Sequence, residues 1–329
     1  MRIALAAIAV LAAGCDLYFG SSGDHSIPDA NRMDGQRAID SHVAIDGGAG
    51  GIGNPPSALD FDSLRDTGHR NVWEVASNTL AQLTDGPGVD KQPAPSGDGR
   101  YLAFASDRGG SMQIYVLDRV LGATSQLTSG SADADEPSFS HDDSRIAYHR
   151  GNAVYVMDAD GRNAQVVADA GSASPDAYEH PRFTADDAGL VFDRVNEIDA
   201  CNLDGSSFHS IVANWTTDEL APVLDGGGDA VAYQVQCEGD AFSVWIVPAA
   251  ESNQPCTGIR VTSPAIANAS HPAWSLQGYV AFELGAAGSA SNASIAFTTA
   301  DSSGPQPFTL ITAGGYDDRD PAWVPPPPL

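Results

Sequence analysis

The chain has 329 residues, of which 42% are hydrophobic, and 43 acidic residues against 16 basic ones give a net charge of −27. This charge excludes nucleic acid as a partner, because binding it needs clustered Lys and Arg, and it also repels anionic lipid headgroups. It favours cations, basic protein patches or neutral ligands. Acidity that only keeps an exported protein soluble is the simpler alternative.

Residues 1–14 have the layout of a secretory signal peptide, with one early arginine and a short apolar run that ends in small residues. The ending Leu11-Ala12-Ala13-Gly14-Cys15 resembles the bacterial lipobox. The resemblance implies cleavage before Cys15, lipidation of Cys15 and a lipid-anchored protein of the bacterial cell envelope, on the periplasmic side or the outer surface. An ordinary cleaved signal with an incidental cysteine is the alternative.

Residues 15–56 read as a disordered tether, rich in Gly, Ser, Asp and Ala. Such a composition buries too little apolar surface to fold alone. Export implies an oxidising compartment. Three further cysteines remain, so at most one pair forms within the chain. Cys237 and Cys256 are the favoured pair because they flank one apparent hairpin region, which leaves Cys201 unpaired.

From residue 57 the sequence repeats. Each copy holds a proline, and the spacing between successive prolines is 41 to 50 residues, which indicates one supersecondary unit used six times. The repeat prolines are Pro93, Pro137, Pro181, Pro222, Pro272 and Pro321.

Within a copy, a proline-containing first strand leads into a turn of Gly, Asp and Ser, which suit tight-turn geometry. A second strand follows, with an aliphatic residue two positions before an aromatic one, as in Leu102 and Phe104 or Ile146 and Tyr148. Third strands such as 113–118 and 153–158 come next, and fourth strands carry Gln-Leu-Thr at 82–84 and 126–128. Four antiparallel strands per copy predict an all-β, six-bladed β-propeller.

The two ends of the repeating region complete each other. The sixth copy supplies only its first strand, while residues 58–61, 71–75 and 79–84 supply the missing three. We therefore expect the N- and C-terminal strands to pair and close a propeller over 57–325, followed by a proline-rich tail at 326–329. We also expect each repeat proline to begin the innermost strand, where its missing donor costs nothing. The aromatic residue two positions later would wedge between blades.

The first two copies resemble TolB-type propeller repeats through Leu83-Thr84, Pro93, Asp98-Gly99, Leu102-Ala103-Phe104 and Ile114-Tyr115, with a similar set from Leu127 to Tyr148. The resemblance covers roughly 57–325 and implies a six-bladed fold. TolB carries a folded domain before its propeller, whereas here about 40 linker residues precede the first strand. This departure argues against a complete Tol–Pal role.

The sequence contains no GxSxG, P-loop, GxGxxG or HExxH motif, so no catalytic residue and no enzymatic activity are predicted. Candidate binding residues lie near the repeat prolines, where they would ring one channel mouth. They could bind Ca²⁺ or another divalent cation or receive a basic segment of a partner; a solvated loop rim is the alternative. The candidates are Asp90, Glu136, His180, Glu219, His271 and Asp320.

Two functions remain open at this point. The first is a non-catalytic cell-envelope lipoprotein whose propeller is a protein–protein interaction scaffold for an envelope protein or peptide, touching the membrane only through its lipid. The second is a metal-dependent carbohydrate-active enzyme or glycan-binding propeller that uses the channel mouth, because two histidines occupy equal repeat positions and imidazole is a common ligand of transition metals.

Overall fold

The computed structural model describes residues 54–65, 68–171, 177–213, 219–237, 241–250, 253–263, 268–285, 293–301, 304–312 and 316–325. The predicted signal peptide, most of the tether, the lipidation site Cys15 and the tail at 326–329 lie outside these residues, and so do the side chains of Glu219 and Leu220. Within the described part of the chain, no helix is long and apolar enough to cross a membrane.

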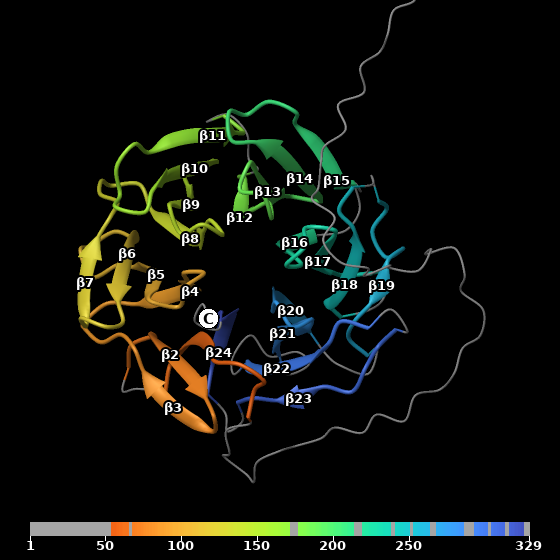
Figure 1. Ribbon diagram of the computed structural model, residues 1–329, viewed down its shortest axis with the longest axis horizontal. Helices are drawn as coiled ribbons and strands as arrows, with labels where there is room; N and C mark the ends of the chain where they lie inside the picture. Colours follow the sequence, from red (N-terminus) through yellow and green to blue (C-terminus); the bar gives the residue numbers. More distant parts are fainter. Residues whose placement is uncertain are drawn as a thin grey trace, which may run out of the picture.

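The described residues form six antiparallel sheets of four strands arranged around a central channel, so the predicted six-bladed β-propeller is confirmed (Figure 1). Blade 1 contains β4 (Asp90–Pro95), β5 (Tyr101–Ser106), β6 (Gln113–Asp118) and β7 (Ala123–Gln126). Blade 2 contains β8 (Ala134–Phe139), β9 (Arg145–Arg150), β10 (Ala153–Asp158) and β11 (Gln165–Asp169). Blade 3 contains β12 (Glu179–Phe183), β13 (Gly189–Arg194), β14 (Glu197–Asn202) and β15 (His209–Ala213).

The remaining blades have the same order from the channel outward. Blade 4 contains β16 (Glu219–Leu224), β17 (Ala230–Val235), β18 (Ser243–Pro248) and β19 (Ile259–Arg260). Blade 5 contains β20 (Ala269–Trp274), β21 (Tyr279–Leu284), β22 (Ser294–Thr299) and β23 (Thr309–Leu310). Blade 6 contains β24 (Asp318–Trp323), β1 (Leu59–Ser63), β2 (Asn71–Ala76) and β3 (Thr79–Gln82).

Blade 6 joins the two ends of the propeller, as the sequence predicts. β24 pairs antiparallel with β1, from Leu59 opposite Trp323 to Ser63 opposite Asp318. Polar contacts reinforce this pairing: the Ser63 hydroxyl donates to Asp318 at 2.5 Å, and Arg65 binds the same carboxylate. Closure covers the inner edge of β1, which would otherwise lack a partner strand.

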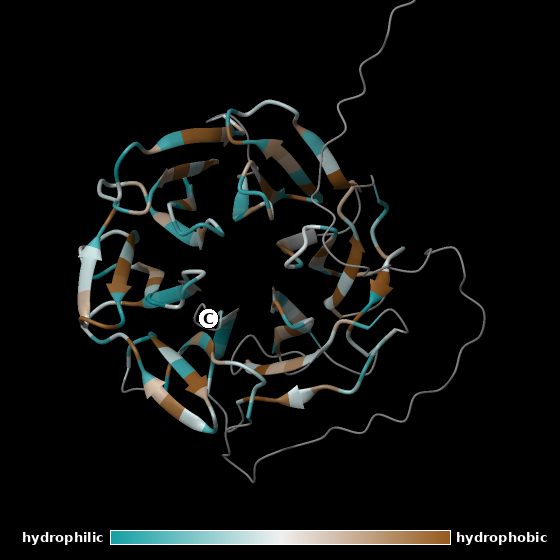
Figure 2. Cartoon of the chain, viewed as in Figure 1, coloured by the Kyte–Doolittle hydropathy of each residue, from teal (hydrophilic) through white to brown (hydrophobic). Residues whose placement is uncertain are grey.

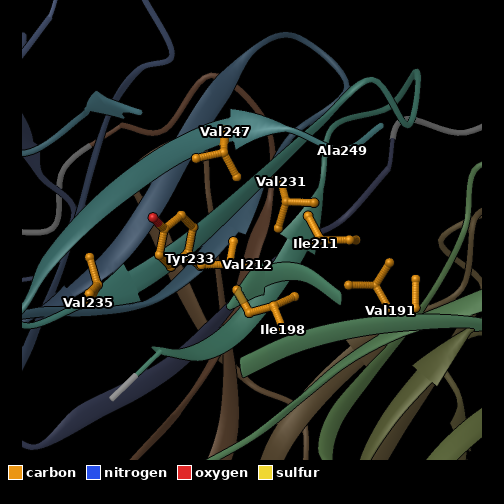
Figure 3. Packing of buried hydrophobic residues seen from close by; sticks show 10 residues of the cluster. Val191, Ile198, Ile211, Val212, Val231, Tyr233, Val235, Val247 and Ala249 are labelled. Carbon is orange, nitrogen blue, oxygen red and sulfur yellow. The ribbon is translucent and has the colours of Figure 1, made fainter. Parts of the chain in front are cut away.

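Apolar side chains from adjacent blades meet in the core between them. Figure 3 shows one such cluster, in which Val191 and Ile198 of blade 3 lie near Tyr233 and Val247 of blade 4. In Figure 2 the hydrophobic residues lie along the strands and the connecting turns are largely hydrophilic. Full burial of side chains this large stabilises a fold by about 1.5–3 kcal/mol each.

The aromatic residue two positions after a repeat proline packs on the preceding blade, as expected. Phe139 of blade 2 packs against a cluster that includes Ala103 and Ile114 of blade 1, and Trp323 of blade 6 lies in a cluster with Ile295 of blade 5. The indole N–H of Trp323 also donates to the carbonyl of Ala273 at 3.0 Å. These rings therefore connect blades through both packing and hydrogen bonding.

The expected place of the proline is wrong. Pro93 and Pro137 are the fourth residues of six-residue strands and do not begin them. The ladder to the second strand shifts register around each proline, between Lys91 and Ala94 in blade 1 and between Asp135 and Ser138 in blade 2. This β-bulge leaves the proline unpaired, so a missing donor costs nothing in mid-strand.

The Leu-Thr pairs predicted in the fourth strands lie just after them, because β3 and β7 end at Gln82 and Gln126. The threonine hydroxyl of each pair accepts a hydrogen bond from the backbone N–H of a third strand, and Thr262 and Thr312, which follow Val261 and Ile311, do the same in blades 4 and 5. These bonds fasten the outer edge of each of these blades. The pairs are Thr84 with Val72, Thr128 with Ile114, Thr262 with Val244, and Thr312 with Ile295.

Cys237 and Cys256 of blade 4 form a disulfide with their Cα atoms 6.1 Å apart. Cys201 of blade 3 is a buried free thiol, and burial raises its pKa to about 11. A thiol that stays protonated and enclosed is chemically inert.

Candidate binding site at the channel mouth

The residue just before each repeat proline has a left-handed backbone. All six have φ between 47° and 55°, although none is a glycine. Such conformations cost about 1–3 kcal/mol each and persist only where the surrounding structure enforces them. We call these six positions the mouth ring; its members are Gln92, Glu136, His180, Ala221, His271 and Asp320.

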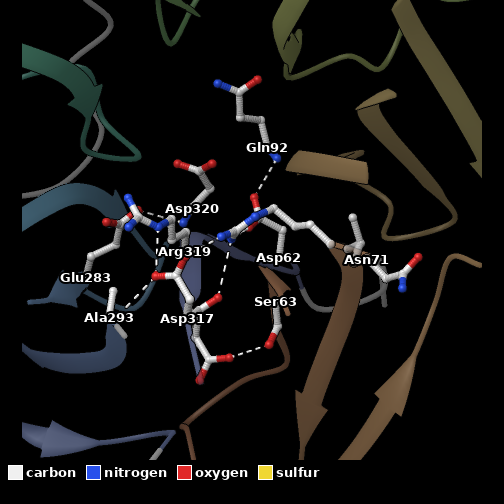
Figure 4. A network of polar contacts seen from close by, with 12 residues as sticks. Asp62, Ser63, Asn71, Gln92, Glu283, Ala293, Asp317, Arg319 and Asp320 are labelled. Atoms are coloured by element: carbon white, nitrogen blue, oxygen red, sulfur yellow. Dashed lines mark hydrogen bonds and ion pairs between the residues drawn. The ribbon is translucent and has the colours of Figure 1, made fainter. Parts of the chain in front are cut away.

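A side chain of the preceding blade accepts a hydrogen bond from the backbone N–H of each mouth-ring residue. The Asp62 carboxylate binds the N–H of Gln92 at 3.0 Å, and the Glu283 carboxylate binds the N–H of Asp320 at 2.9 Å (Figure 4). Gln234 does the same for His271 at 2.7 Å, and Asp193 for Ala221. Each acceptor directly follows the aromatic residue of a second strand.

Two blades use a different acceptor, for a reason visible in the sequence. The position after the second-strand aromatic is Ala105 in blade 1, which has no acceptor, and His149 in blade 2. In these two blades the side chain of the mouth-ring residue itself is the acceptor. Gln92 accepts from the N–H of Glu136 at 3.2 Å, and Glu136 accepts from the N–H of His180 at 2.6 Å. The six blades are thus joined at the mouth by a complete ring of side-chain-to-backbone bonds, the mouth latches.

Two imidazoles meet over the channel because blade 4 contributes only the small Ala221 between them. The ring centroids of His180 and His271 are 5.9 Å apart. His180 reaches Asp193 through Nδ1 at 2.9 Å and Glu136 through Nε2 at 3.3 Å. Burial opposes protonation of His180, but the negative charges of Glu136 and Asp193 outweigh it and raise its pKa to about 10.

The same balance holds for the other histidines near the mouth. Burial disfavours the charged form of His271, yet Glu283, 3.1 Å from Nδ1, together with Asp320 raises its pKa to about 9. His149 contacts Asp135 at 2.8 Å, and its pKa also rises to about 9 despite burial. At neutral pH these imidazoles are cations held by carboxylates.

Four of the six sequence-predicted residues line one cavity of about 190 Å³ at the mouth: Glu136, His180, His271 and Asp320. The structure describes only the backbone of Glu219. Asp90 is not among the residues that line this cavity; its carboxylate is 1% exposed and receives two hydrogen bonds from Arg108 at 2.8 and 2.9 Å. Gln92 takes its place, because ring membership follows distance from the proline and not acidity.

Among the residues that the structure describes, three groups of side chains have ligand atoms close enough to hold a metal ion, with the atoms of each group within 4.8 Å of one another. A cation would have to displace the proton that each group's histidine carries, because only neutral imidazole binds metal. The raised histidine pKa values therefore weaken all three sites at neutral pH. The groups are Asp135, Glu136 and His149; Glu136, Glu179 and His180; and His271, Glu283 and Asp320.

Residues 61–196 match the family model of the TolB beta propeller domain. The Tol-Pal system protein TolB of Francisella tularensis subsp. mediasiatica is 33% identical over 86 residues, which is 24% of this chain and 19% of that protein. The chain thus matches about a fifth of the length of this relative.

Two solved structures share the fold. TolB from Acinetobacter baumannii superposes with a TM-score of 0.67 at 18% identity, covering 83% of this chain and 68% of that one. Kuenenia stuttgartiensis hydrazine synthase gives a TM-score of 0.64 at 13% identity, covering 82% and 47%. The six blades, the family match over residues 61–196 and these similarities indicate that the repeats of this chain are of the TolB propeller type.

Proposed function

We propose that the protein is a non-catalytic, exported, lipid-anchored scaffold whose channel mouth binds a segment of another envelope protein. The mouth latches are the observation that carries this proposal. They hold six strained backbone positions in one arrangement around an open cavity. A surface whose geometry is fixed before binding loses little conformational entropy when a partner arrives.

Similarity supports an envelope partner. The curated relatives are named as components of a Tol-Pal system, and residues 61–196, within the repeats, match the TolB beta propeller domain. We infer a partner of the same kind, a protein or peptide of the cell envelope. The long-range field of a chain with net charge −27 favours a segment flanked by basic residues, and this attraction should weaken as salt is added.

A metal-dependent carbohydrate-active or glycan-binding protein is the second candidate. The three metal-sized groups favour it, whereas the protons on their histidines oppose it. Elemental analysis of the dialysed full chain at pH 7 separates the two candidates. Stoichiometric metal that disappears in His180→Ala would favour the second candidate over the scaffold.

Site-specific photocross-linking in cells tests the scaffold proposal. A photoreactive residue at Val195 lies in a hairpin turn at the mouth face, and one at Asp160 lies in a hairpin turn at the opposite face; both positions are exposed. The Val195 probe should give a protein adduct of one discrete mass that the Asp160 probe does not give. Equal adducts at both positions, or none at Val195, would refute binding at the mouth.

The anchor is tested separately. Cys15→Ser in the full chain should abolish incorporation of radiolabelled palmitate and release the protein from the membrane fraction. Continued labelling of this variant would rule out Cys15 as the lipidated residue, with no consequence for binding at the mouth.

A further inference from the structure

One residue of the channel lining departs from its repeat equivalents. The residue directly after each repeat proline lines the mouth cavity in all six blades. In five of them this residue is small, and in blade 3 it is an arginine. The six are Ala94, Ser138, Arg182, Val223, Ala273 and Ala322.

Arg182 has few partners for a guanidinium. Its one hydrogen bond to a described residue is to the carbonyl of Pro181 at 2.9 Å, although an arginine carries five N–H donors. No carboxylate of the described chain lies within ion-pair distance of it, whereas Arg108 rests on both oxygens of Asp90. Most of the donors of Arg182 are therefore available to a ligand.

The groups around Arg182 do not compensate for the hydration that its guanidinium loses on burial. Burial lowers the pKa of Arg182, and the opposing attraction of Glu136, Asp320 and Asp193 does not make up for it. A desolvated, underpaired cation gains when an anion binds beside it, because hydrogen bonds between charged groups are the strong ones.

The carboxylates at the mouth do not close the site to an anion, because cations already engage them. His180 contacts both Glu136 and Asp193, and His271 contacts Glu283 and, at 3.9 Å, Asp320. An incoming negative charge thus meets two imidazolium groups as well as the guanidinium.

The size of the cavity limits the ligand. Its volume is about 190 Å³, and away from the charged residues its lining includes Phe139, Val223, Trp274 and Trp323. An apolar cavity of about 150 Å³ holds one benzene molecule. The space therefore suits one planar carboxylate joined to one ring or a short aliphatic group.

We propose that the channel mouth is a receptor for a carboxylate carried on a small apolar or aromatic body, with Arg182 as the bidentate anchor. The carboxylate belongs either to a free small organic acid or to the C-terminus of a partner chain. This ligand site goes beyond the scaffold function, because a free acid would occupy it without any protein partner.

Calorimetric titration of the full chain at pH 7 tests the proposal with matched pairs of probes. Benzoate is compared with benzamide, and N-acetylphenylalanine with its amide, so that each pair differs chiefly in charge. We expect the acid of at least one pair to bind roughly ten- to one-hundred-fold more tightly than its neutral partner. Preference in the benzoate pair indicates a free acid, and preference confined to the peptide-like pair indicates a chain terminus.

Three variants assign the effect to Arg182. Arg182→Gln should abolish the preference for acids, Arg182→Lys should keep part of it, and Arg162→Gln, at an exposed arginine in the β10–β11 turn of the opposite face, should leave it unchanged. If Arg182 only balances nearby carboxylates, Arg182→Gln should lower the melting temperature, whereas the proposal predicts an unchanged or higher one. Equal binding of acids and neutral probes, absence of binding by all probes, or acid preference that survives Arg182→Gln would overturn it.

Discussion

Blades 1 to 3 and blades 4 and 5 build the same architecture with different devices. In blades 2 and 3 the second aspartate of the turn between the first and second strands binds the preceding blade. Asp143 accepts from the N–H groups of Gly97 and Asp98, and Asp187 accepts from those of His141 and Asp142. The described residues of blades 4 and 5 show no counterpart. Those blades have two-residue fourth strands, and blade 4 holds the disulfide.

The mouth latches are the device that both groups share. Gln92 and Glu136 complete the ring in one half with their own side chains, and Gln234 and Glu283 complete it in the other from the second strand. The face opposite the mouth is therefore fastened by aspartates on one side only, whereas the mouth is fastened all the way round. A rigid mouth is what a binding surface at this end requires.

The wedge between blades 5 and 6 should give the largest effect. Trp323→Ala removes a buried ring, its contacts with blade 5 and its hydrogen bond to Ala273. We expect a loss of about 3–5 kcal/mol in the free energy of unfolding, measured by urea denaturation. A loss below about 1 kcal/mol would mean that this ring does not join the blades.

Removal of the disulfide should have the second-largest effect on stability, and the loosening should be greatest in the half of the propeller that contains it. Cys237 and Cys256 are 19 residues apart, and closing a loop of that size stabilises a protein by about 3 kcal/mol. The Cys237→Ser/Cys256→Ser double variant should lose about this much. Its hydrogen exchange should quicken first in blade 4, while exchange in blades 1 and 2 stays slow. Uniform acceleration in all blades would contradict the distinction between the two groups.

Removal of a mouth latch should lower the free energy of unfolding by a similar amount in either half of the propeller. Gln234→Leu leaves the N–H of His271 without its acceptor, and Gln92→Leu does so for Glu136. An unsatisfied buried donor costs about 1–3 kcal/mol. Denaturation should give losses in this range for both variants. A loss in only one of them would show that the latch is not a common device.

The pH dependence follows from the raised histidine pKa values. A histidine whose pKa is higher in the folded than in the unfolded state stabilises the fold below about pH 6.5, and this contribution is lost as pH rises through the folded pKa of about 9 to 10. Melting temperature should therefore fall between pH 7 and 10. The fall should be shallower in His180→Gln, and an equal slope in both proteins would contradict the pairing.

The smallest effect is expected at the face opposite the mouth. Asp187→Ala removes the acceptor for two exposed turn N–H groups, which water can then bind. We expect a loss of about 0.5–1.5 kcal/mol by urea denaturation. Asp225 lies in the corresponding turn of blade 4 and binds only within its own turn, so Asp225→Ala is the matched control for loss of turn capping alone.

The sequence was sufficient to predict the fold because its main signals are local. A proline and an aromatic residue two positions apart, repeated at regular intervals, indicate the blades, and the incomplete copies at both ends indicate closure. The mouth was harder to predict. Asp90 is acidic and precedes a repeat proline, yet it faces Arg108, whereas the uncharged Gln92 and Ala221 hold ring positions.

The latch acceptors could not be found by motif. In the Asp62 to Gln92 latch, donor and acceptor are 30 residues apart on different blades, and the Glu136 to His180 latch spans 44 residues. Donor and acceptor can be matched only when the repeats are aligned on the proline bulge, which marks the donor, and on the aromatic residue of the second strand, which marks the usual acceptor position. Arg182 was missed because candidates were sought among acidic residues and histidines that precede the prolines, whereas Arg182 is basic and directly follows Pro181.

Closure by β24 and β1 is tested most directly by hydrogen exchange on a variant that lacks residues 57–78. Since β24 would lose its partner strand, we predict that amides in blade 5 and blade 1, on either side of the gap, exchange much faster and that cooperative unfolding is lost. Unchanged protection in both neighbouring blades, together with a melting transition as sharp and as high as that of the intact protein, would contradict the closed ring.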